Sequence, residues 1–93
     1  MANPEIGKRV AQMSVKVVFF ASLRDKVGVR ELSLTASSLD HLLHLLEDQL
    51  PAEAYAALVE PNVRVAVNQE LVEGNQTLFE GDEVAFLPPV TGG

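Results

Sequence analysis

Residues 37–51 read SSLDHLLHLLEDQLP, and their leucines recur at the three- and four-residue spacing of a helix. His41, His44 and Asp48 project from the side opposite the apolar stripe, which consists of Leu39, Leu42, Leu43, Leu46 and Leu50. Ser37 and Asp40 have the spacing of a capping pair at the helix start. Pro51 ends the helix, because a proline disfavours helical geometry in the residue before it. The segment predicts an amphipathic helix that covers one face of a larger structure.

Strand patterns precede this helix. Residues 15–21 are β-branched and aromatic, which favours a strand. After a turn at Gly28, residues 30–35 alternate between polar and apolar side chains. We expect the two segments to form a hairpin, with residues 23–27 as the connection between them.

Strand patterns also follow the helix. Residues 52–59 form a short second helix or irregular turns, and residues 63–67 then alternate as a third strand. Residues 68–70 form a turn before a short strand at Leu71-Val72. Gly81-Asp82 form another turn before the last strand, residues 83–87.

The order of these elements is strand, strand, helix, strand, short strand, strand. One amphipathic helix can cover one face of a mixed sheet of this size, so the sequence predicts an α+β domain in two layers. This is the arrangement of the β-grasp, or ubiquitin-like, fold. We expect the final strand to deliver the chain end directly into solvent.

A chain of 93 residues is expected to form one domain. Residues 1–12 have mixed polarity and no clean period, so we interpret them as a flexible N-terminal extension. The β-grasp domain then spans residues 13–93 and ends in an exposed Gly-Gly tail. Pro88 and Pro89 stop the sheet pairing before this tail, because neither has an N–H to donate.

The formal charge of −6 comes from 13 acidic and 7 basic residues. Such a surface repels phosphate backbones, which argues against nucleic-acid binding. It suits partners with basic docking surfaces, or it serves only to keep a small protein soluble. No apolar run approaches the roughly 20 residues of a membrane span, and the N-terminus lacks a signal-peptide pattern, so a cytoplasmic location is expected.

Strand alternation predicts which apolar side chains the helix leaves uncovered. In the first strand Val15, Val17 and Phe19 share one face, and the face that carries Lys16 is expected to be the open one. The open face would present Val18, Phe20, Ala66 and Leu87, with Leu71 nearby. A contiguous apolar patch usually marks a binding site. The alternative is that Phe20 packs under a neighbouring loop.

Groups for enzyme chemistry are missing from the sequence. The chain has no cysteine, no phosphate-binding glycine loop and no nucleophile elbow. His41 and His44 are three residues apart on a helix, but no third metal ligand is evident. We therefore expect no metal, no bound cofactor and no catalysis by this chain alone.

The C-terminal carboxylate remains as a reactive group. Gly92 and Gly93 have no Cβ, so the chain end can enter a channel too narrow for other residues. A carboxylate is a poor electrophile and must first be activated, most simply as an acyl-adenylate made with ATP on a partner enzyme. A sulfur donor can then displace AMP and leave a thiocarboxylate on Gly93. Pro88 and Pro89 would stiffen the base of the tail and lower the entropy lost on insertion.

Three segments of the chain resemble the small, sulfur-carrying subunit of molybdopterin synthase. They read VKVVFFASLRDKVG near the start, VAVNQELV in the third-strand region and GDEVAFLPPVTGG at the end. The resemblance covers residues 13–93, and the double proline before Val-Thr-Gly-Gly is its most specific feature. Residues 36–60 match only in pattern.

The resemblance implies a β-grasp sulfur carrier in molybdenum cofactor biosynthesis. Gly93 would be adenylated by an adenylyltransferase that resembles ubiquitin-activating enzymes, with ATP consumed there, and would then receive sulfur from a sulfur donor as a thiocarboxylate. The tail would insert into the large subunit of a heterotetramer and pass sulfur to cyclic pyranopterin monophosphate (precursor Z). The residues implied in reaction are Gly92 and Gly93, and those implied in partner binding are Phe20, Leu71, Leu87, Pro88, Pro89, Val90 and Thr91.

Three other functions stay open at this point. A sulfur carrier for thiazole synthesis or tRNA thiolation would share the fold and the Gly-Gly end, but those relatives lack the Pro-Pro stretch. A ubiquitin-like modifier would join Gly93 to lysines through an isopeptide bond. A plain interaction domain would have an inert tail.

Overall fold

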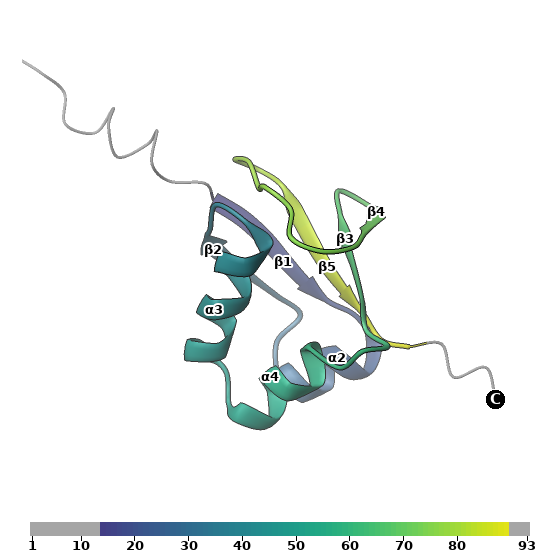
Figure 1. Ribbon diagram of the computed structural model, residues 1–93. Coiled ribbons are helices and arrows are strands. Elements are labelled where there is room, and N and C mark those ends of the chain that lie inside the picture. Colours follow the sequence, from purple (N-terminus) through teal and green to yellow (C-terminus); the bar gives the residue numbers. More distant parts are fainter. Residues whose placement is uncertain (1–13, 90–93) are drawn as a thin grey trace, which may run out of the picture.

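The computed structural model describes residues 14–89, which form a mixed five-stranded sheet with its helices gathered on one side (Figure 1). The elements are β1 Ser14–Phe19, α2 Ala21–Val27, β2 Glu31–Thr35, α3 Leu39–Gln49, α4 Ala52–Leu58, β3 Arg64–Val67, β4 Glu70–Val72 and β5 Glu83–Leu87. The predicted α+β class, a mixed sheet packed on one main helix, is confirmed. The predicted extension at residues 1–12 and the tail residues Val90, Thr91, Gly92 and Gly93 lie outside the described residues.

The strand order is β2-β1-β5-β3-β4, so β5 lies at the centre of the sheet. β1 pairs with β5 in parallel, and the other neighbouring strands are antiparallel. Parallel pairing places the C-terminal ends of β1 and β5 at the same edge of the sheet. Phe20, which follows β1, is therefore close to Pro88, which follows β5.

The helix α3 closes one face of the sheet as its leucine pattern predicted. Leu39, Leu42 and Leu46 are buried, whereas His41, His44 and Asp48 are exposed. The capping residue is Ser38 and not the predicted Ser37, because the Ser38 hydroxyl accepts from the His41 N–H at 3.1 Å. Ser38 has extended backbone geometry and is the last residue before the helix, so its hydroxyl reaches the free N–H groups of the first turn.

The core lies between α3 and the inner face of the two central strands. Val17 is completely buried opposite Val84, and Phe19 lies opposite Phe86 in the parallel pairing. The rings of Phe19 and Phe86 are stacked, with 5.8 Å between their centroids. The inward and outward faces of β1 and β5 are thus as the alternation predicted.

One connection differs from the prediction, and the structure decides between the two alternatives left open for another. Residues 23–27 belong to the helix α2, which ends when the Gly28 N–H bonds the Arg24 carbonyl at a φ of 95°. Only Leu23 is buried in α2, so this short helix leaves little periodic signal. Residues 52–59, left open between helix and turns, contain the helix α4.

The turn predicted at residues 68–70 is one residue shorter in the structure. Asn68 and Gln69 both have positive φ, 52° and 72°, which is the geometry of a two-residue hairpin loop. Glu70 therefore already pairs with Val67 as the first residue of β4.

Candidate docking face at the base of the tail

The outer face of the sheet is apolar where the chain leaves β5. Leu87 lies beside Arg64 of β3, and Ala85 lies between Val18 of β1 and Ala66 of β3. Phe20 joins this group because its N–H donates to the Phe86 carbonyl at 3.2 Å. Residues from β1, β3 and β5 therefore meet at the base of the tail.

These residues surround a shallow depression of about 340 Å³. It is lined by Phe20, Ala66, Gln69, Leu71, Glu83, Ala85 and Leu87. Phe20 is 45% exposed and Leu71 is 57% exposed, which is unusual for large apolar side chains. The structure therefore brings Phe20, Leu71 and Leu87 to one surface, whereas their role in partner binding stays a prediction.

The floor of this depression differs from the prediction. Ala66 was expected to be presented to a partner, but it is only 5% exposed, and Ala85 is only 8% exposed. Both point outward and are nevertheless buried. Val18 is half-buried and does not line the depression. Alternation gives the direction of a side chain, but its size decides whether it reaches the surface.

Phe20 does not pack under a loop, so the alternative reading of this residue is wrong. It has extended geometry and is followed by Ala21 with a φ of 51°. A left-handed conformation at a residue with a Cβ costs roughly 1–2 kcal/mol. This turn ends β1 and starts α2, and it leaves the Phe20 ring outside the core.

The tail begins at this surface. Pro88 is half-buried and Pro89 is exposed, and both follow Leu87 outside the sheet. Val90, Thr91, Gly92 and Gly93 continue beyond the described residues, so the predictions for them stay predictions. The described part of the tail thus starts next to the apolar depression.

Side chains for metal or acid–base chemistry do not gather within residues 14–89. This range contains no group of three or more His, Cys, Asp and Glu side chains that could hold a metal ion. His41, one of the two histidines considered above, uses its Nδ1 to accept from the Ser37 N–H at 3.2 Å. No helix within the same range is long and apolar enough to cross a membrane.

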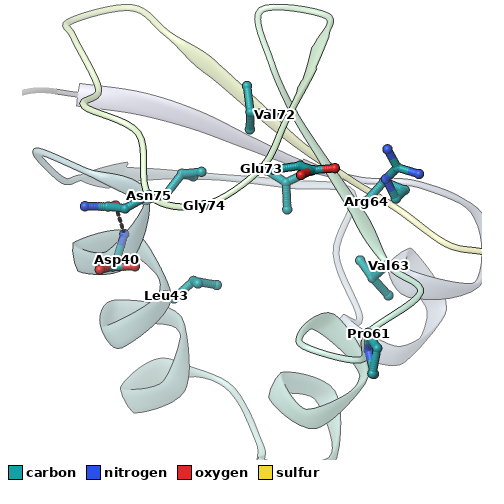
Figure 2. Close-up of a pocket in the computed structure, with 11 residues that line it drawn as sticks. Asp40, Leu43, Pro61, Val63, Arg64, Val72, Glu73, Gly74 and Asn75 are labelled. Atoms are coloured by element: carbon teal, nitrogen blue, oxygen red, sulfur yellow. Dashed lines mark hydrogen bonds between the residues drawn. The ribbon is translucent and has the colours of Figure 1, made fainter.

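A larger hollow, of about 460 Å³, lies on the other face of the sheet (Figure 2). Leu43, Val63 and Val72 contribute apolar surface to it, and the Asp40 N–H bonds the Asn75 side chain at its border over 2.8 Å. Figure 2 shows the guanidinium of Arg64 directed away from this hollow. The hollow is thus separated by the sheet from Phe20 and Leu71.

A mixed sheet closed by one main helix, with the tail leaving its central strand, defines a ubiquitin-like β-grasp protein. The chain belongs to the ThiS family, whose model matches residues 17–93. It is 39% identical to the molybdopterin synthase sulfur carrier subunit of Escherichia coli, over 85% of this chain and 99% of that protein. The predicted family resemblance is therefore confirmed.

Solved structures agree on the fold. The small archaeal modifier protein 1 of Methanosarcina acetivorans has a TM-score of 0.72 and 31% identity, over 88% of this chain and 98% of that one. A chain in the complex of subunits 1 and 2 of the molybdopterin-converting factor from Helicobacter pylori has a TM-score of 0.68 and 28% identity. That match covers 87% of this chain and 100% of the Helicobacter chain.

Proposed function

We propose that this chain is a sulfur carrier of molybdenum cofactor biosynthesis and the small subunit of a cytoplasmic molybdopterin synthase. The observation that carries the proposal is the position of the apolar depression at the base of a tail that ends in Gly92-Gly93. A carrier needs a surface that holds its partner and an end that enters the partner. The relationship to sulfur carrier subunits supports the same function.

The reactive group in this proposal is the carboxylate of Gly93. Its oxygen attacks the α-phosphorus of ATP on an adenylyltransferase that resembles ubiquitin-activating enzymes, and pyrophosphate leaves. Sulfide supplied by a sulfur donor then attacks the acyl carbon, the bond to AMP breaks, and Gly93 carries a thiocarboxylate. Glycines suit this step because they have no Cβ to block a narrow channel.

The second half of the proposed cycle takes place on the large subunit of the synthase. Phe20, Leu71 and Leu87 dock against that subunit, and Pro88 and Pro89 direct Val90, Thr91 and the two glycines into its active site. The thiocarboxylate sulfur bonds to a carbon of cyclic pyranopterin monophosphate, and water then cleaves the acyl carbon–sulfur bond, which leaves the sulfur on the pterin and regenerates the carboxylate of Gly93. Two carriers and two large subunits form the heterotetramer in this proposal. The complex of subunits 1 and 2 of the molybdopterin-converting factor from Helicobacter pylori supports the large-subunit partner.

Mass spectrometry of the intact chain tests the chemistry. After incubation with the adenylyltransferase, ATP and a sulfur source, we expect a mass gain equal to the replacement of one oxygen by sulfur at Gly93. A chain that lacks Gly93 is the matched control and should not gain this mass. An unmodified full-length chain in the presence of active partners would contradict the proposal.

A second candidate function is protein modification. It is favoured by the 31% identity with the small archaeal modifier protein 1 of Methanosarcina acetivorans. The same activated Gly93 would then be transferred to a lysine amine and form an isopeptide bond. Detection of Gly93 on lysine side chains in peptide digests of cell extracts would establish this function beside sulfur transfer.

A further inference from the structure

Part of the apolar depression lies on a hairpin at the edge of the sheet. Gln69 and Leu71 both line the depression, and both belong to the hairpin of β3 and β4. β4 is last in the strand order, so β3 is its one neighbouring strand among the described residues (Figure 1). The place of Leu71 on the surface therefore depends on how the turn between these two strands is fixed.

Asn68 begins this turn and continues the strand pairing with its side chain. Its backbone N–H donates to the Glu83 carbonyl over 2.8 Å, one residue beyond the pairing of Val67 with Val84. In a regular antiparallel pair the Glu83 N–H would bond the Asn68 backbone carbonyl in return. It bonds Oδ1 of the Asn68 side chain instead, at 3.0 Å, and Asn68 has a left-handed φ of 52°. The amide oxygen thus takes the place of the backbone carbonyl, so the chain can turn while its pairing with β5 is kept.

The nitrogen of the same amide is fastened to the loop before β5. Nδ2 of Asn68 donates to Oδ1 of Asp82 over 2.9 Å, and Oδ2 of Asp82 accepts from the Phe79 N–H at 2.8 Å. The backbone carbonyl of Asp82 accepts from the Lys16 N–H at 2.9 Å, so Asp82 is itself tied to β1. Asn68 therefore connects the edge hairpin to the centre of the sheet.

The exposure of Asn68 indicates that its bonds serve position more than stability. Asn68 is exposed, whereas Asp82 and Glu83 are half-buried. Water can replace a hydrogen bond at an exposed side chain, so the loss of the amide should change the free energy of unfolding little. Water does not reproduce the fixed geometry of these bonds, however. An interface loses affinity when the groups that fill it must first be ordered on binding.

We propose that Asn68 is a positioning residue for docking of the synthase large subunit, because it holds Leu71 in place before the partner arrives. This inference rests on the proposed function and goes beyond it, since Asn68 does not itself line the depression. Removal of the amide leaves the Leu71 side chain in the molecule. Each binding event must then also order the hairpin, which lowers the affinity.

Asn68→Gly tests the inference. Glycine adopts positive φ readily, so the turn is kept while the amide is removed. We expect about 5- to 10-fold weaker binding of the large subunit in calorimetric titration. The titration is carried out at a temperature at which unfolding curves show both the variant and the unaltered chain to be folded.

A double-mutant cycle separates positioning from a general loss of structure. Asn68→Gly is combined with Leu71→Ala and, in a second chain, with Phe20→Ala, which alters the same depression at the end of β1. We expect Asn68→Gly to weaken binding less than about 2-fold once the Leu71 side chain is absent. Beside Phe20→Ala it should keep its effect of about 5- to 10-fold.

Exchange of the two side chains provides a rescue with unchanged net charge. Asn68→Asp alone places two carboxylates side by side and should weaken binding at least as much as Asn68→Gly. With Asp82→Asn added, a carboxylate at position 68 can accept from the Glu83 N–H and from an amide at position 82. The oxygen of that amide can accept from the Phe79 N–H. We expect this double variant to bind within about 2-fold of the unaltered chain. Comparison of these two chains repeats the test if Asn68→Gly impairs folding.

The outcomes separate this inference from the proposed function. Unchanged affinity of Asn68→Gly, or equal effects of it beside Leu71→Ala and Phe20→Ala, would overturn the positioning role while the complex still formed. Failure of Asp82→Asn to restore binding to Asn68→Asp would do the same. If the unaltered chain formed no complex with the large subunit, the proposed function would fail and this inference with it.

Discussion

The two faces of the same sheet are built in different ways, and β5 shows the difference within one strand. Its inward residues, Val84 and Phe86, are buried against α3 and the ring of Phe19. Its outward residues, Ala85 and Leu87, form part of a depression bordered by exposed Phe20 and Leu71. The inner face thus stabilises the domain, while the outer face is left available for a partner.

Truncation at the inner face should produce the largest change in stability. Phe86→Ala removes one ring of the stacked pair and leaves a cavity, so we expect it to lower the free energy of unfolding by about 3–5 kcal/mol. Denaturant unfolding measures this loss. Leu87→Ala, the next residue on the outer face, is the control and should cost less than about 1.5 kcal/mol. Equal losses for the two variants would contradict the division between the faces.

Truncation at the outer face should affect binding and leave stability nearly unchanged. We expect Phe20→Ala to weaken binding to the synthase large subunit by about 2 kcal/mol, or about 30-fold in Kd. Calorimetric titration measures this change. Phe79→Ala is the control, because Phe79 is 61% exposed but does not line the depression. If both phenylalanine variants bound equally well, the depression would not be the docking surface.

The cap of α3 tests how the inner layer is held in place. Ser38→Ala removes the hydroxyl that accepts from the His41 N–H, so we expect a loss of about 1 kcal/mol in the free energy of unfolding. Ser37→Ala should cost less, because Ser37 takes part through its backbone N–H, which the substitution keeps. Thermal unfolding of both variants distinguishes them. A greater loss of stability for Ser37→Ala than for Ser38→Ala would show that Ser38 does not cap the helix.

The left-handed residue next to Phe20 gives the smallest expected effect. Ala21→Gly relieves the cost of a Cβ at a φ of 51°, so we expect a gain of up to about 1 kcal/mol in unfolding free energy. Ala56→Gly, an exposed change inside α4, should instead lose about 1 kcal/mol. Comparable losses at both positions in denaturant unfolding would show that Ala21 is not strained.

The residues that the sequence predicts correctly are those with a strong period. The leucines of α3 and the alternating residues of β1 and β5 take the predicted faces, because periodic burial dominates their folding. The helix α2 was missed, because Leu23 is its one buried residue. Likewise, alternation alone could not show that Ala66 and Ala85 are buried at the bottom of the depression, because burial also depends on the size of a side chain and of its neighbours.

The candidate site was predicted in part for the same reason. Alternation predicted Phe20 and Leu87 on the outer face, whereas Leu71 was expected only near them, and in the structure all three line the depression. Gln69 and Glu83 also line the depression but were missed, because a polar residue at a strand end gives no signal of its neighbours. The grouping depends on the strand order, in which β5 pairs with both β1 and β3.

Reconstitution of the synthase with a chain that lacks Gly93 tests the central claim most directly. The sample contains the large subunit, the adenylyltransferase, ATP, a sulfur source and cyclic pyranopterin monophosphate, and both complex formation and the dithiolene product are measured. We predict that the shortened chain binds the large subunit through its intact outer face but yields no product. Product formation at the rate of the full-length chain would contradict the account.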